Sequence, residues 1–375
     1  MKYIFIVQGE GRGHLTQCMA LEEILRKNGH EVVEILVGKS QSRQLPDFFM
    51  RSIQAPIRRF ESPNFLPTAS NKRNNILRSV GYNLLKVPTY LKSMRFIKER
   101  IRETQAEVVV NFYELLTGLT YALYHIKVPQ ICIGHQYLFL HKNFHLPEIN
   151  KAEIRLLNIF SQLTCLGASK KLALSFTKME DDNDHRICIV PPLLRKEVFS
   201  IQATTGNYIH GYMVNAGFAE NVMAWHQRCP ETELRFFWDR KGEKEVKVID
   251  ETLSFHPLDD KAFLKQMSGC KAYASTAGFE SVCEAMYLGK PILMVPAHIE
   301  QDCNAYDAEK SGAGIISSDF NLQQLLDFAK DYHPNRDFVY WVRGAEYTLL
   351  SLLESDSSNY QQVLFNEMYL VEEFI

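Results

Sequence analysis

The feature that most constrains the fold of this 375-residue chain is the alternation of short, β-branched runs with segments of helical length. The alternation begins at residues 2–8, stops at the proline pair Pro191-Pro192, and starts again after it. Strands that alternate with helices indicate parallel sheets covered on both faces. We therefore expect an α/β protein of two Rossmann-like, doubly wound domains that face each other across a cleft.

The two halves contribute similar sets of elements. In the first half we expect strands at residues 2–8, 31–37, 107–111, 128–134 and 163–167, with helices at 14–28 and 114–125. In the second half we expect strands at residues 208–215, 233–238, 271–274 and 291–295, with one helix that ends near Arg228 and another that starts near Phe279. The expected domains are residues 1–192 and 193–337, and a helical tail, 338–375, is expected to pack back on the first domain.

Composition excludes several classes of protein. No apolar run approaches the roughly 20 residues of a membrane-spanning helix, and the eight cysteines form no CxxC pair, which favours a cytoplasmic protein with free thiols. His141 and His145 stand four residues apart, but no third ligand lies nearby, so surface histidines are a better interpretation than zinc. We expect no metal and no cofactor.

Positive charge is concentrated in one segment. Between Arg51 and Glu103 the sequence has twelve Lys or Arg residues and three acidic ones, and apolar residues are interleaved with them. Such a segment suits an anionic membrane surface or an acidic acceptor, or it forms core-packed helices with solvated basic faces. No nucleic-acid-binding motif accompanies the charge. A peripheral position on the inner face of the membrane is therefore one expectation.

The first loop, GEGRGH at residues 9–14, differs from a dinucleotide-binding loop. Its glycines, Gly9, Gly11 and Gly13, are spaced GxGxG, and His14 stands where the GxGxxG fingerprint has its third glycine. A side chain there would crowd a pyrophosphate on the helix. A histidine at the carboxyl end of the first strand could instead take a proton from a hydroxyl group. The alternative is a histidine that only caps the helix.

A second turn, near residue 278, has the features of a diphosphate site. A strand ends at Ser275-Thr276, the turn Ala277-Gly278 follows, and a helix begins at Phe279. The free N–H groups at that helix start, with the hydroxyls of Thr276 and Ser281, could hold phosphates without a metal. One helical turn later, Glu284 is placed to accept both hydroxyls of a ribose. The loop after the next strand carries three residues suited to a sugar: Glu300, Gln301 and Asn304.

The same stretch resembles the donor-binding box of inverting glycosyltransferases of the two-Rossmann-domain (GT-B) type. Those families pair G-x-x-[ST]-x-x-E with G-x-P, a strand that ends in proline, and E/D-Q-x-x-N-A. The chain has Gly278 to Glu284, Gly289-Lys290-Pro291, Val295-Pro296 and Glu300 to Ala305 in that order. The stretch is similar to the plant UDP-glycosyltransferase box and to the peptidoglycan enzyme that adds N-acetylglucosamine to lipid I. The first loop also resembles the G-x-G-G-H loop of these families.

The resemblance implies transfer of a sugar, with inversion, from a nucleotide-diphosphate sugar to a hydroxyl acceptor. It implies a UDP-sugar donor, no metal requirement and, through the lipid I enzyme, a role in cell-envelope polysaccharide synthesis. Glu284 would bind the ribose, Thr276, Gly278 and Ser281 the phosphates, and Glu300 and Gln301 the transferred sugar. Two positions depart from the plant box: Thr276 replaces a histidine, and Glu280 replaces an asparagine.

Further candidates follow other expected strands. Glu114, with His135 and Gln136, would face the acceptor side of the cleft, where Glu114 could assist or replace His14 as the base. Gly217 and Phe218 open the first helix of the second domain and could touch the donor. Two other functions share this architecture: a nucleotide-sugar 2-epimerase, and a protein that binds sugar nucleotides without catalysis.

Overall fold

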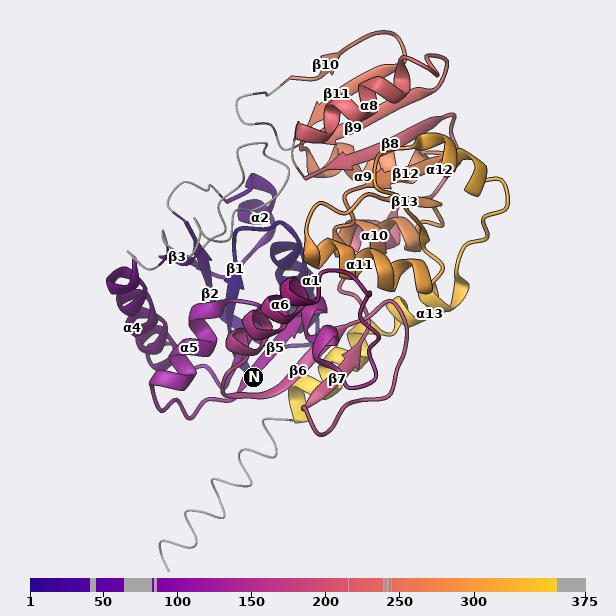
Figure 1. Ribbon diagram of the computed structural model, residues 1–375. Helices are drawn as coiled ribbons and strands as arrows, with labels where there is room; N and C mark the ends of the chain where they lie inside the picture. The colour runs from indigo at the N-terminus through magenta and orange to yellow at the C-terminus, as the bar shows by residue number, and fades with distance from the viewer. Residues whose placement is uncertain are drawn as a thin grey trace, which may run out of the picture.

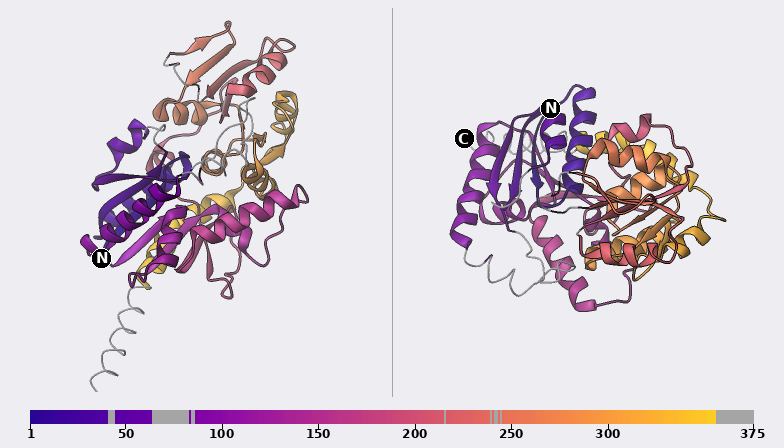
Figure 2. Two further views of the ribbon diagram at one scale, coloured as in Figure 1. Left: turned by 60° about the vertical axis from the view of Figure 1, so that its left-hand side comes forward. Right: turned by 90° about the horizontal axis from the view of Figure 1, so that it is seen from above.

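The chain forms two α/β domains, each built on a seven-stranded sheet, in a computed structural model that describes residues 1–40, 45–63, 83, 86–214, 216–238, 240, 243 and 245–355 (Figure 1). Figure 2 shows the two sheets lying side by side when the molecule is seen from above. The expected architecture of two facing Rossmann-like domains is confirmed.

The first sheet has the strand order β3-β2-β1-β4-β5-β6-β7, and all neighbouring strands are parallel. Its strands are β1 (Lys2–Gln8), β2 (Glu31–Lys39), β3 (Ile57–Glu61), β4 (Val108–Phe112), β5 (Gln130–Gly134), β6 (Ala168–Leu174) and β7 (Ile187–Val190). Its helices are α1 (Gly13–Lys27), α2 (Asp47–Ser52), α4 (Val87–Glu103), α5 (Leu115–Leu123), η1 (His135–Leu140) and α6 (Lys151–Thr164). The strand order reverses between β1 and β4, which is where such sheets bind ligands.

The second sheet has the order β10-β11-β9-β8-β12-β13-β14, and only the short edge strand β10 runs antiparallel. Its strands are β8 (Tyr208–Met213), β9 (Glu233–Trp238), β10 (Lys247–Val248), β11 (Leu253–Pro257), β12 (Ala272–Ser275), β13 (Ile292–Met294) and β14 (Gly314–Ile316). Its helices are α7 (Lys196–Ser200), η2 (Ala216–Phe218), α8 (Ala219–His226), α9 (Asp260–Gly269), α10 (Phe279–Tyr287), α11 (Ile299–Lys310) and α12 (Leu322–Phe328). Here the order reverses between β8 and β12.

Local sequence explains the best-predicted elements. Residues Tyr3 to Val7 of β1 are fully buried, as expected for a central parallel strand packed on both faces. Helix α1 ends at Asn28, and Gly29 follows with a φ of 78°, a left-handed conformation that glycine adopts without strain. Gly289 ends α10 in the same way, with a φ of 68°.

Two expectations about local structure are wrong. Residues 163–167 are not a strand: they form the end of α6 and the turn after it, and the strand begins at Ala168. That strand, β6, contains two half-buried lysines, Lys170 and Lys171, so it lacks the continuous apolar run that marks a buried strand. Residues 300–304 are not a loop but the first turns of α11.

The C-terminal helices cross from the second domain to the first. Helix α13 (Arg336–Arg343) is followed by helical residues 345–355, drawn in yellow running past β6 and β7 in Figure 1. In this segment Trp341 Nε1 donates to the Ser175 carbonyl at 2.9 Å. Glu346 pairs with Lys27 at 2.8 Å, and Glu354 with His30 at 3.0 Å. Residues 356–375 of the expected tail lie outside the described residues.

The basic region is described only in part, because residues 64–82 and 84–85 lie outside the described residues. Helix α4 begins at Val87 with Pro88 in its first turn, a position that accepts proline, so Pro88 starts this helix. Its inner charges are paired, since Arg100 contacts Glu34 and Glu103. Its outer face exposes Lys92, Arg95 and Lys98. No helix in the described part of the chain combines the length and apolar content needed to span a membrane.

Candidate functional site

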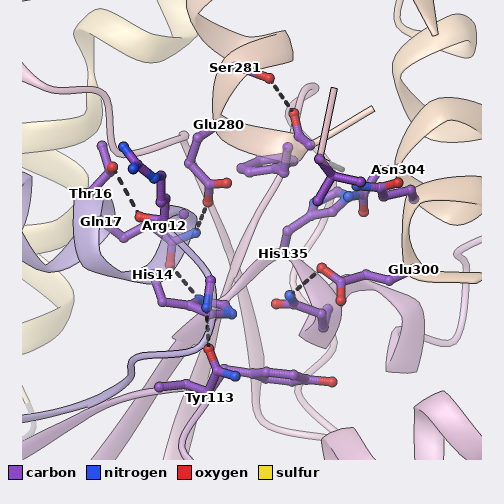
Figure 3. A pocket seen from close by; sticks show the side chains of 18 of the residues that line it. Arg12, His14, Thr16, Gln17, Tyr113, His135, Glu280, Ser281, Glu300 and Asn304 are labelled. Atoms are coloured by element: carbon purple, nitrogen blue, oxygen red, sulfur yellow. Dashed lines mark hydrogen bonds between the residues drawn. The ribbon is translucent and has the colours of Figure 1, made fainter. Parts of the chain in front are cut away.

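A cavity of about 340 Å³ lies between the domains, where the carboxyl ends of the two sheets face each other (Figure 3). It is lined by the loops after β1 and β4 in the first domain, and by the starts of α10 and α11 in the second. The volume falls in the range of small-molecule sites. Both points of strand-order reversal open on this cavity, so the fold brings the two loops singled out in the sequence together.

His14 lies at the second position of α1 and lines the cavity. Its ring stacks on Tyr113, with ring centroids 5.4 Å apart and an angle of 25° between the planes. Its Nδ1 lies 3.3 Å from Gln17 Oε1. Burial lowers the pKa of the imidazole, so the ring is neutral at pH 7 and can accept a proton.

Two of the three loop glycines lie in close contact with other parts of the molecule. A Cβ on Gly9 would lie 2.6 Å from Val37 Cγ1, and a Cβ on Gly13 would lie 2.2 Å from Glu280 Oε2. Gly11 is exposed and has no such conflict. The loop therefore approaches its own sheet at Gly9 and the opposite domain at Gly13. The negatively charged group beside Gly13 is thus the side-chain carboxylate of Glu280.

Tyr113 and Glu114 follow β4, and both line the cavity. Tyr113 has a φ of 58°, a strained conformation for a bulky residue, and this places its ring against His14. Glu114 is fully buried at the start of α5, where it accepts hydrogen bonds from Ser62 Oγ at 2.6 Å and from the Leu116 N–H at 3.1 Å. Burial raises the pKa of Glu114 to about 7. The structure gives Glu114 the role of a helix cap on the wall of the cavity.

His135 and Gln136 occupy different environments although they are adjacent. His135 is buried, donates from Nδ1 to the Leu174 carbonyl at 2.7 Å and stacks on Phe279 at 4.0 Å. Burial lowers the pKa of His135 to about 3, so it packs as a neutral ring at the domain interface. Gln136 Nε2 reaches across the cavity and donates to Glu300 Oε1 at 2.8 Å.

The turn between β12 and α10 divides the expected phosphate residues into two sets. Gly278 and Ser281 line the cavity, whereas Thr276 and Ala277 are fully buried and do not. Thr276 Oγ1 accepts a hydrogen bond from the Val214 N–H at 3.1 Å, so it joins the two turns of the second domain. Ala277 has a φ of 57°, a strained conformation that turns the chain into α10.

Two further donor candidates lie away from the cavity. Gly217 and Phe218 are absent from its walls, and Phe218 packs on Phe320 in the core of the second domain. The residues of this region that do line the cavity are Tyr212 and Val214. The structure thus brings the end of β8 to the site rather than the start of η2.

Glu284 has a partner that sequence analysis missed. The carboxylate of Glu284 is buried and receives two hydrogen bonds from Arg195, at 2.6 Å from Nε and 2.8 Å from Nη2. Arg195 also contacts the Asp260 carboxylate. Two carboxylates raise the pKa of the guanidinium well above its usual value. Arg195 follows the proline pair, and nothing in its local sequence indicates a contact with a residue 89 positions away.

Helix α11 contributes three polar residues to the cavity: Glu300, Gln301 and Asn304. Gln301 Oε1 accepts from the Ala297 N–H at 2.9 Å, which satisfies the start of the helix. Asn304 Nδ2 donates to the Ala277 carbonyl at 3.3 Å. Asn304 Oδ1 and Gln136 Oε1 are buried and have no hydrogen-bond partner among the described residues. Buried acceptors of this kind call for a donor, such as a ligand hydroxyl.

The described residues contain no cluster of three or more His, Cys, Asp or Glu side chains that could hold a metal ion. Asp259 caps α9 by accepting from the Ala262 N–H at 2.7 Å, and Asp260 contacts Arg195. The expectation of a surface histidine is wrong for His141, which is buried with its Nε2 2.9 Å from the Glu180 carbonyl.

The fold is shared with solved glycosyltransferases of the GT-B type. The glycotransferase of kitacinnamycin aligns with a TM-score of 0.65 at 13% identity, covering 94% of this chain and 98% of its own. Phytolacca americana UGT2, solved with UDP-2fluoro-glucose and pterostilbene, aligns with a TM-score of 0.61 at 13% identity, covering 95% and 99%. Arabidopsis thaliana UGT89C1 aligns with a TM-score of 0.62 at 15% identity, covering 95% and 99%.

A family model also matches the sequence itself. The model for glycosyl transferase family 1 matches residues 1–332, which include both sheets and every wall of the cavity. The chain belongs to this family. No curated protein sequence matches the chain.

The pair of Arg195 and Glu284 provides a test of stability. Replacing Arg195 by Met leaves a buried carboxylate without its partner, and breaking a buried ion pair in this way costs about 3–5 kcal/mol. We expect Arg195→Met to lower the free energy of unfolding in urea by that amount.

The matched control is the next residue, Lys196. Its ion pair with Glu23 is mostly exposed, so Lys196→Met should cost no more than about 1 kcal/mol. Equal effects of the two variants would show that Glu284 does not depend on Arg195 for a buried ion pair.

Proposed function

We propose that the protein transfers a sugar from a nucleotide-diphosphate sugar to a hydroxyl acceptor, with inversion at the anomeric carbon. The observation that carries the proposal is the placement of His14. A neutral imidazole at the start of α1 lines the same cavity as the start of α10. A base from one domain and a phosphate-binding helix start from the other suit an in-line displacement.

In the proposed step, the imidazole of His14 takes the proton of the acceptor hydroxyl as that oxygen bonds to the anomeric carbon. The bond from this carbon to the diphosphate oxygen breaks on the opposite face, which inverts the configuration. The helix start at Phe279 has Gly278 as its N-cap residue, and its N–H groups and dipole stabilise the departing diphosphate. Base catalysis of this kind contributes about 10²–10⁴-fold in rate.

The donor is proposed to be a UDP-sugar, because Phytolacca americana UGT2 was solved with UDP-2fluoro-glucose and Arabidopsis thaliana UGT89C1 with UDP. Glu284 would receive the ribose hydroxyls. A carboxylate has about four lone-pair sites, so the two bonds from Arg195 leave sites on both oxygens. The buried acceptors on Asn304 and Gln136, with Glu300, would receive hydroxyls of the transferred sugar.

We expect loss of the base to affect turnover and not donor binding. His14→Asn should lower kcat/KM by about 10²–10⁴-fold and leave the Kd of UDP, measured by calorimetry, unchanged. The control is His333→Asn, because His333 is exposed and should retain full activity. A His14→Asn enzyme with wild-type turnover would refute the assignment of the base.

We expect loss of the ribose acceptor to weaken donor binding. Glu284→Gln keeps the size of the side chain but removes its charge and one acceptor oxygen. The Kd of UDP should rise by the equivalent of about 1–3 kcal/mol, the usual cost of an unsatisfied buried hydrogen-bonding group. The control is Glu220→Gln on the exposed face of α8. An unchanged UDP affinity in Glu284→Gln would remove Glu284 from the donor site.

Activity is proposed not to need a divalent cation, because the helix start and neighbouring hydroxyls such as that of Ser281 can bind the diphosphate themselves. We expect the initial rate of nucleotide release to be the same in EDTA as in magnesium. Activity that vanishes in EDTA and returns with magnesium or manganese would contradict this proposal.

The acceptor is proposed to be lipid-linked and to serve cell-envelope polysaccharide synthesis at the cytoplasmic face of the membrane. The support is the exposed row of Lys92, Arg95 and Lys98 on α4, in the first domain. Each cation near an anionic surface contributes about 1 kcal/mol, which salt screens.

This proposal predicts reversible attachment to anionic vesicles. Co-sedimentation with phosphatidylglycerol vesicles should increase with the anionic fraction and decrease with salt, and the triple variant Lys92→Glu/Arg95→Glu/Lys98→Glu should abolish it. The matched control reverses three exposed lysines of the second domain: Lys261, Lys265 and Lys271. Equal binding by both variants, or none by the wild type at low salt, would favour a water-soluble acceptor.

A further inference from the structure

A chain of hydrogen bonds joins His14 to a carboxylate of the opposite domain. His14 Nδ1 lies 3.3 Å from Gln17 Oε1, and Gln17 Nε2 donates to Glu280 Oε1 (Figure 3). Gln17 lies one helical turn after His14 on α1 and is almost fully buried. Glu280 is in the first turn of α10. The resemblance to plant enzymes assigned Glu280 no role, since those enzymes have asparagine there.

The sequence of donors and acceptors along these hydrogen bonds determines which nitrogen of His14 carries the proton. An ionised carboxylate only accepts hydrogen bonds, so the amide nitrogen of Gln17 must face Glu280. The amide oxygen of Gln17 then faces His14, and Nδ1 must be the protonated nitrogen that donates to it. The lone pair is left on Nε2, which is the atom that can accept a proton from an acceptor hydroxyl.

The contact depends on the relative position of the two domains. Glu280 fills the space beside Gly13, where even a single Cβ would lie 2.2 Å from its Oε2 atom. The start of α1 thus accommodates the carboxylate only because residue 13 is glycine. Separation of the domains would move Glu280 away from Gln17. The side-chain amide of Gln17 could then rotate by 180°, so that its nitrogen rather than its oxygen faces His14.

We propose that Glu280 is a positioning residue that acts through Gln17 to hold His14 in the tautomer with a bare Nε2, so that the base is complete only when the domains are closed. The inference rests on the proposed role of His14. Its functional consequence is protection of the donor, because an open enzyme would not activate water for hydrolysis of the nucleotide sugar.

Because Glu280 is titratable, its positioning of His14 through Gln17 should depend on pH. The carboxylate is faced by Gln17 and Gly13 of α1, by Glu300 of α11 and by Glu284 of its own helix. Burial, with the two acids as smaller contributions, raises the pKa of Glu280 to about 7. Because the ionised form is the one that orients Gln17, kcat/KM should rise with pH through about 7. In Glu280→Gln the rise of kcat/KM near pH 7 should disappear. The rise at lower pH, which reflects deprotonation of His14 with its lowered pKa, should remain.

The direct test is the tautomer of His14, measured by two-bond ¹H–¹⁵N correlation NMR on protein labelled with ¹⁵N-histidine. The chain has 12 histidines, and the signal of His14 is identified by its loss in His14→Asn. We expect a protonated Nδ1 and a bare Nε2 in the wild type. In Glu280→Gln and in Gln17→Met, which fills a similar volume without hydrogen bonding, we expect a mixture of tautomers and a kcat lower by about 10- to 100-fold.

The control variant is Glu309→Gln, an exposed position on α11, which should keep the wild-type tautomer and rate. Thermal unfolding of each variant separates loss of fold from loss of positioning. A wild-type His14 with the proton on Nε2, or a tautomer unchanged in both test variants, would overturn the proposal. If the tautomer changes as expected but His14→Asn retains full activity, the positioning stands and the proposed base fails, so the two failures are distinguishable.

Discussion

The contact on which the site depends is the packing of Phe279 against the first domain. Phe279 begins α10, and its ring lies 4.0 Å from that of His135 and 4.8 Å from that of Phe176. Phe338 of the C-terminal helices also packs on Phe176, with ring centroids 6.3 Å apart. This apolar cluster holds the start of α10 against the carboxyl end of the first sheet. The cavity, the reach of Glu280 to α1 and the alignment of His14 with the proposed diphosphate site all follow from it.

The cavity between the domains also contains carboxylates with shifted pKa values. Glu114 and Glu280 line the cavity, and burial raises the pKa of each to about 7. Glu284 is compensated by Arg195 instead. Carboxylates whose pKa values lie near 7 can gain or lose a proton at neutral pH with little change in free energy. This property suits a cavity proposed to admit an anionic donor.

The sequence predicted those parts of the protein that depend on neighbouring residues. The β-branched runs, the glycines after α1 and α10, and the turns after β1 and β12 were located because each has a local pattern. Helix α11 was missed because its first turns are polar, and β6 because Lys170 and Lys171 interrupt its apolar run. Arg195 and Gln17 were missed for another reason: their partners lie 89 and 263 residues away, and no local pattern indicates such contacts. The same limit applies to Thr276, whose hydroxyl looks available in the sequence but contacts Val214 in the fold.

The central claim is that the closed cavity carries out transfer to an acceptor with inversion. The most direct measurement combines nucleotide release with the anomeric configuration of the product. A UDP-sugar that raises the Tm would be incubated with and without a panel of hydroxyl acceptors, with UDP quantified and the product examined by NMR. The account predicts UDP release that requires an acceptor, and a glycoside of opposite anomeric configuration to the donor. Retention of configuration, or conversion of the donor to an epimer without any acceptor, would contradict it.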